Sequence, residues 1–166
     1  MRPTVTRFAI AAVFTLTASA SYAQSSLPRP DLTPGATNPE VTPDTIDNTI
    51  CASGWTQTVR PPAQYTTQLK RQQIRQYGYA DRKLRDFEED HLIALGIGGA
   101  PRDPHNLWPE PRHPADGWTV AKKDQLEVTL QKLVCAHRVP LAEAQRAMAD
   151  NWTAVYQKYE DMWRNR

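Results

Sequence analysis

An acid and an imidazole stand side by side at Asp90 and His91, and an amide follows at Asn106. A neutral imidazole, with a pKa of about 6.5, can take a proton from water near neutral pH. Carboxylate and amide oxygens are ligands that hard divalent cations prefer, and such a cation can offset the charge that develops in phosphodiester hydrolysis. The three residue types therefore suit a hydrolytic site with one metal ion.

Two short strands are predicted to position these side chains, one at 87–95 and one at 106–108. The connection between them contains two adjacent glycines and two prolines, and it is long for a plain hairpin. Long ordered loops often carry functional residues. Because adjacent residues of a strand point to opposite faces, Asp90 and His91 converge only at a bulge or at a strand end.

The same stretch resembles the HNH branch of the His-Me finger (ββα-metal) nucleases. The residues that carry the resemblance are Asp90-His91-Leu92-Ile93, then Gly98-Gly99, then Asn106-Leu107. It implies that His91 activates water, that Asp90 binds the metal, and that Asn106 binds the metal or orients His91. Mg²⁺ is the expected cation, with Mn²⁺, Ca²⁺ and Zn²⁺ as alternatives. The wider pattern, with two C-terminal helices, is similar to small exported bacterial proteins described as HNH-like.

The chain departs from that family in two places. Ala94 stands where a proline commonly follows the apolar pair. Many members carry a final histidine on the helix after the hairpin, but no histidine occurs between residues 118 and 135. The candidates for this third metal position are His113, after the second strand, and Asp124 and Glu127 on the predicted helix.

A basic segment precedes the hairpin. Between residues 60 and 85 there are seven Lys and Arg side chains and one acid, for a local charge of +6. Apolar residues at three- and four-residue spacing predict a helix over 64–79 within it. The segment is either a solvated basic face or a surface that follows phosphates. For the second case the expected nucleic-acid contacts are Lys70, Arg71, Arg75, Lys122 and Lys123.

The first 23 residues are typical of a secretory signal peptide, with a basic start, a short apolar run and small residues before Gln24. Removing them lowers the formal net charge from +2 to 0, which neither favours nor excludes a nucleic-acid partner. Residues 24–43 are rich in Pro, Ser, Thr and Asn and predict a poorly ordered leader. Residues 44–166 then form a single domain, which begins with a short strand or an irregular wall at 45–59.

Two cysteines, Cys51 and Cys135, remain after the signal peptide. In an oxidising compartment an even count favours a disulfide, the alternative being two unrelated buried thiols. Closing the loop between residues 51 and 135 should stabilise the fold by about 4 kcal/mol in the chain-entropy model. Two helices complete the chain, one at 118–138 and one that begins at Pro140.

Taken together, these features predict an α+β fold with a ββα-metal finger core, one helix before it and two after it. The protein is expected to be a divalent-metal-dependent endonuclease of low sequence specificity, either periplasmic or secreted. It is expected to be a monomer that binds DNA or RNA through the phosphate backbone. One alternative is a non-catalytic module that binds nucleic acid or another envelope polymer. A structural envelope protein is the other, in which His91, Asp90 and Asn106 only make hydrogen bonds within a hairpin.

Overall fold

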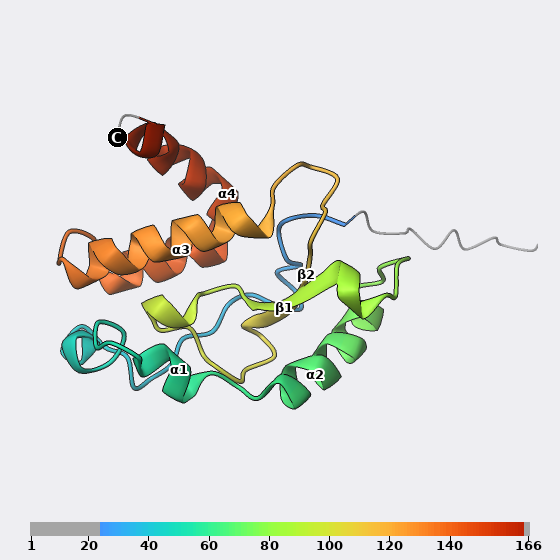
Figure 1. Cartoon of the computed structure of the whole chain (residues 1–166), viewed down its shortest axis with the longest axis horizontal. Coiled ribbons are helices and arrows are strands. Elements are labelled where there is room, and N and C mark those ends of the chain that lie inside the picture. The colour runs from blue at the N-terminus through green and yellow to red at the C-terminus, as the bar shows by residue number, and fades with distance from the viewer. Residues whose placement is uncertain (1–23, 165–166) are drawn as a thin grey trace, which may run out of the picture.

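The computed structural model describes residues 24–164, and the predicted signal peptide lies outside the described residues. Within them the protein is mixed α+β, with four α-helices and one two-stranded antiparallel sheet (Figure 1). None of its helices there is long and apolar enough to cross a bilayer. In chain order the elements are η1 Ile46–Asn48, α1 Trp55–Val59, α2 Ala63–Gln76, η2 Leu84–Asp86, β1 Phe87–His91, η3 Leu95–Ile97, β2 Leu107–Pro111, α3 Val120–Cys135 and α4 Leu141–Arg164.

The β1–β2 hairpin lies in the middle of the molecule, with α2 on one side and α3 and α4 on the other (Figure 1). Its register pairs Asp90 with Trp108 and His91 with Leu107, without a bulge. The first strand ends at His91, four residues earlier than predicted, because the side chain of Asn106 takes both backbone groups of Ile93. The second strand runs on to Pro111, since prolines are tolerated on an edge strand that needs no further donors.

Polar side chains of α2 hold this helix against the hairpin. The predicted helix is confirmed, although it ends at Gln76 because Gly78 follows with a φ of +71°. Buried Gln73 donates to the backbone oxygens of Leu107 at 2.7 Å and Pro104 at 3.1 Å. Lys70 donates to the backbone oxygen of Phe87 at 3.0 Å. Both strands are therefore fastened to α2 through their carbonyl groups.

Residues 24–43, for which we expected a poorly ordered leader, run along the core instead. Ser26 and Thr33 are buried. Trp152 of α4 donates to the backbone oxygen of Ser26 at 2.9 Å, and the hydroxyl of Tyr77 donates to Thr33 at 2.6 Å. Each of these contacts involves a single residue of the segment. The segment therefore packs against the core although its sequence has no apolar periodicity.

The short strand expected at 45–59 is not present. This stretch forms η1 and α1, because its backbone bonds are local, such as Thr49 N–H to the oxygen of Ile46 at 3.2 Å. Among the described residues the sheet has two strands, β1 and β2, so the β-branched residues here have no neighbouring strand to join. The other alternative, an irregular wall, describes the segment better.

The two C-terminal helices form where they were predicted. In α3 the side chains of Leu126, Leu130 and Val134 are buried. The buried residues of α4 form one apolar stripe: Leu141, Ala144, Met148, Trp152 and Tyr156. At Asn151 the backbone leaves the helical region, and the Asn151 side chain accepts from the N–H of Ala154 at 3.1 Å. This asparagine therefore ends one helical segment and caps the next.

The predicted disulfide is confirmed: Cys51, after η1, is bonded to Cys135, the last residue of α3. Their Cα atoms are 5.6 Å apart across a sequence separation of 84. Nearby, Gln131 donates to the backbone oxygen of Ile50 at 2.8 Å. The end of α3 is thus attached to the N-terminal part of the fold by one covalent bond and one hydrogen bond.

Removing this disulfide should lower the stability of the protein. For the double variant Cys51→Ser/Cys135→Ser we expect a loss of up to about 4 kcal/mol in the free energy of unfolding, because the unfolded chain regains the entropy that the loop closure removed. Denaturant unfolding of the variant and of the oxidised parent measures the difference. The reduced parent is the matched control and should unfold with the variant; equal stability of all three would contradict the prediction.

Candidate functional site

His91 is the last residue of β1 and is 5% exposed. Its Nε2 lies 3.0 Å from the backbone oxygen of Pro101. A carbonyl oxygen can only accept, so the imidazole must donate here, which leaves Nδ1 as the nitrogen with a lone pair. Burial lowers the pKa of His91, although the bond to Pro101 and the charge of Asp90 oppose that shift. The imidazole is therefore neutral near pH 7 and can accept a proton at Nδ1.

The carboxylate of Asp90 meets the ammonium of Lys123 from α3. The side chain of Lys123 is 0% exposed. Its Nζ also donates to the backbone oxygen of His91 at 2.8 Å and to Glu127 one turn along α3. An ammonium has three donor hydrogens, and all three have acceptors here. Burial would raise the pKa of Asp90, but the charge of Lys123 holds that pKa below its usual range.

Two further carboxyls, Glu110 and Glu127, interact with this ammonium. Burial and the charge of Asp90 raise the pKa of Glu110 to about 10, so Glu110 is protonated at neutral pH. Burial raises the pKa of Glu127 to about 7, although Lys123 opposes the shift. Burial also disfavours the charge of Lys123, but the carboxyls outweigh it and raise the lysine pKa. The negative charge of the carboxyl groups is thus offset by the Lys123 ammonium and by the proton that Glu110 binds.

Asn106 holds the connection between the strands. Its Oδ1 accepts from the N–H of Ile93 at 2.9 Å, and its Nδ2 donates to the backbone oxygens of Ile93 and Ala100, each at 3.0 Å. Gly99 passes so close that a Cβ there would lie 1.7 Å from the oxygen of Ile93. The amide of Asn106 therefore shapes the loop that brings Pro101 to His91.

A divalent cation does not fit this set of donors as it is arranged. The carboxylates of Asp90 and Glu127 already accept from Lys123, and the amide of Asn106 is bonded to backbone. Across residues 24–164, no three His, Cys, Asp or Glu side chains are grouped so that they could hold a metal ion. Metal binding by Asp90 and Asn106 stays a prediction from the sequence.

The three candidates for the third metal position lie in different surroundings. Glu127 reaches Asp90 through the ammonium of Lys123. Asp124 is exposed, and its pKa is raised by partial burial and by the charge of Asp90. His113 is exposed in the loop after β2. Of the three, Glu127 is the one that the fold brings into the same hydrogen-bonded cluster as Asp90.

The predicted nucleic-acid contacts divide into buried and exposed side chains. Lys123 is interior, which does not fit a contact with phosphate, because its position on α3 lies within the buried stripe. Lys122 lies over the ring of Trp118, with its Nζ 4.7 Å from the centroid. Lys70 is half-buried and bonded to β1. The two that remain exposed, Arg71 and Arg75, lie on the outer side of α2.

These two arginines line a hollow. Together with Arg82, Ile74 and Leu84 they enclose about 310 Å³ beside α2. Arg82 is fixed by a bond of 3.2 Å from its guanidinium to the backbone oxygen of Ile74. Three guanidinium groups around one concave surface favour an anionic ligand, because each presents several N–H donors.

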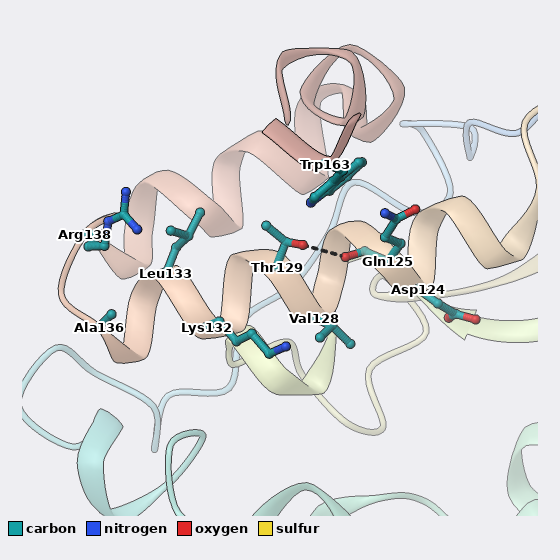
Figure 2. A pocket seen from close by; sticks show the side chains of 9 residues that line it. All are labelled: Asp124, Gln125, Val128, Thr129, Lys132, Leu133, Ala136, Arg138 and Trp163. Carbon is teal, nitrogen blue, oxygen red and sulfur yellow. Dashed lines mark hydrogen bonds between the residues drawn. The ribbon is translucent and has the colours of Figure 1, made fainter. Parts of the chain in front are cut away.

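A groove along α3 is lined by neither His91 nor Asp90. It measures about 490 Å³ and runs along α3, where Thr129 lies on the side of the helix that faces Trp163 of α4 (Figure 2). Asp124 lies at one end of it and Arg138 at the other. A smaller hollow of about 150 Å³, lined by Arg60 and Glu127 among others, borders the Asp90 cluster. Of the cluster, Glu127 is the residue that lines this smaller hollow.

Two side chains of this site are not marked by the residue motif. Lys123 falls at the spacing of the apolar stripe of α3, and a lysine at such a position is a sign of a buried cation. Glu89 lies on the His91 face of β1, and neither carboxyl oxygen has a hydrogen-bond partner within the described residues. Burial raises the pKa of Glu89 to about 8, against the opposing charge of Lys70.

No protein-family model matches the chain, no curated protein matches it, and no solved structure matches it. What the protein does is therefore inferred from the contacts of the hairpin, the loop between its strands and α3.

Proposed function

We propose that the protein is an exported endonuclease that hydrolyses phosphodiester bonds with low sequence specificity. His91 is its general base. The observation that carries the proposal is the state of this imidazole: Nε2 is tied to the backbone oxygen of Pro101, and burial lowers the pKa, so Nδ1 is free of a proton at neutral pH. A base of this kind is what the activation of water requires.

In this reaction Nδ1 of His91 takes a proton from water while the water oxygen attacks phosphorus. The bond from phosphorus to the leaving oxygen breaks, and that oxygen takes up a proton from solvent water. The imidazolium that forms lies next to the charge of Asp90, which stabilises it. Arg60 is exposed, acts electrostatically on His91 and lines the small hollow beside the cluster. Its guanidinium is therefore placed to bind the phosphoryl oxygens of a bound strand.

The order of the elements supports this proposal. β1, β2 and α3 follow one another in the order that a ββα finger requires, and Asp90 of the first strand is bonded to Lys123 of the helix. We propose that these three elements form a finger core of the His-Me type. The helix α2 precedes it, and α4 packs against α3.

The substrate is proposed to be DNA or RNA held by its phosphates. The arginine-lined hollow beside α2 supports this choice, because guanidinium groups bind phosphate without reading the bases. Export is supported by the predicted signal peptide and by the Cys51–Cys135 disulfide, a bond that persists in oxidising compartments.

A second candidate function is that of a module that binds nucleic acid without hydrolysing it. It is favoured by the burial of His91, which is 5% exposed. The arginine-lined hollow would serve this function equally well. The two candidates differ in one result, since the module retains labelled DNA or RNA in a binding assay and leaves it uncut.

Replacing the base tests the proposal directly. We expect His91→Ala to lower the rate of cleavage of plasmid DNA or structured RNA by about 100- to 10,000-fold, because the water loses its proton acceptor. The control is His105→Ala, which removes an exposed histidine from the loop between β1 and β2. Rates are measured with Mg²⁺ and with a chelator. A His91→Ala variant that cleaves as fast as the parent would rule out this role.

The dependence of the rate on pH gives an independent check. A base whose pKa is lowered stays neutral further into the acid range, so kcat/KM should fall only as the pH drops below 6.5, the ordinary value for histidine. The charges that act on His91 are those of Asp90, Lys123 and Arg60. In Glu89→Gln, which removes another buried carboxyl, this acid limb should remain. An acid limb above pH 6.5 would contradict the assignment.

The proposed phosphate contacts predict a change in salt dependence. For Arg71→Ala/Arg75→Ala we expect weaker binding to any sequence, and a plot of log affinity against log salt that is less steep by about 2, one unit for each phosphate lost. Fluorescence anisotropy with labelled oligonucleotides measures both quantities. The control is Arg146→Ala on α4, an exposed arginine away from the hollow. Equal slopes for all three proteins would place the nucleic acid elsewhere.

A further inference from the structure

We infer that Lys123 supplies the cation of this site from within the chain, so that neither the fold nor hydrolysis at His91 requires a divalent metal. The statement about the fold stands alone. The statement about hydrolysis rests on the proposed function.

The oxygens around Lys123 are of the kind that bind a hard cation. Two are carboxylate oxygens, from Asp90 on β1 and Glu127 on α3, and one is the backbone oxygen of His91 at 2.8 Å. They come from a strand, a strand end and a helix and converge on one point. Such a convergence is the geometry of a cation site, and the cation at its centre is an ammonium.

A metal ion would have to displace that ammonium. The Lys123 side chain is 0% exposed, and its three donor hydrogens are all used within the site. Moving Nζ aside would leave a buried charge without partners, which is strongly unfavourable. The amide of Asn106, the other predicted metal ligand, would also have to leave the backbone of Ile93. Both displacements oppose metal binding in this fold.

The contact with His91 gives Lys123 a second consequence. Its Nζ holds the backbone oxygen of His91, while Pro101 holds the imidazole from another side. Lys123 therefore acts as a positioning residue for the end of β1. It does not reach a substrate, because it is buried beneath Asp90 and Glu127.

Removing the ammonium should create a metal site. In Lys123→Ala the oxygens of Asp90, Glu127 and His91 face an empty position, so we expect the variant to bind Mn²⁺ and its Tm to rise by about 5 °C or more at a saturating concentration. Calorimetric titration and thermal unfolding of the oxidised mature chain measure both effects. If the variant folds poorly without metal, circular dichroism with and without Mn²⁺ measures how much folded structure the metal restores.

The parent protein provides the arm that does not depend on the variant folding. We expect its Tm to be the same in Mg²⁺, in Mn²⁺ and in a chelator. Calorimetry should detect no Mn²⁺ binding at Asp90, so the parent and Asp90→Asn should give the same titration. Lys132→Ala, which removes an exposed lysine of the same helix, is the control and should behave like the parent. The inference also predicts that cleavage by the parent continues in the chelator.

Each outcome bears on one statement. A parent that binds Mn²⁺ through Asp90 overturns the inference, whether or not it cleaves nucleic acid. Cleavage that stops in the chelator and returns with Mg²⁺ overturns the statement about hydrolysis but leaves the endonuclease proposal in place. A parent that is insensitive to metals and never cleaves supports the internal cation and contradicts the proposed function. A folded Lys123→Ala that gains no Mn²⁺ binding also overturns the inference.

Discussion

A buried ammonium holds the centre of this fold together. Lys123 joins the end of β1 to α3 through three acceptors, and no water replaces any of them because the side chain is 0% exposed. A buried charge is tolerated only when it is paired and fully hydrogen-bonded, and the Asp90 carboxylate provides the pairing. This contact joins the end of β1, with the backbone of His91, to the first turn of α3.

The second constraint is the loop between the strands. Asn106 uses its whole amide on backbone groups, and Gly99 approaches the oxygen of Ile93 so closely that no side chain fits there. The loop is long, yet it is buried over most of its length. Because the loop carries Pro101, its shape decides which nitrogen of His91 keeps the proton. Backbone geometry and proton position are thus linked in this hairpin.

The elements with a regular period could be predicted from the sequence. The helices α2, α3 and α4 follow apolar stripes, and the disulfide was predicted from two cysteines that follow a predicted signal peptide. Residues 24–43 and 45–59 could not be predicted, because they pack by single contacts such as that of Trp152 with Ser26, and such contacts have no period.

For the site, residue types indicated Asp90, His91 and Asn106, but they did not indicate their partners. Adjacent residues of a strand face opposite ways, so the sequence alone left open what each side chain meets. Lys123 was among the predicted nucleic-acid contacts, although its spacing on α3 places it within the buried stripe. Its role depends on a tertiary contact with a strand 33 residues earlier, and local patterns carry no information on that pairing.

The Cys51–Cys135 bond has a consequence for resistance to proteolysis. It closes a covalent ring that contains α1, α2, the hairpin and all of α3. A protease that cuts one peptide bond anywhere inside the ring, for example in the exposed loop after β2, leaves the two pieces linked. The nicked molecule can keep β1 against α3, so a single cleavage by a neighbouring protease need not release the site-bearing half.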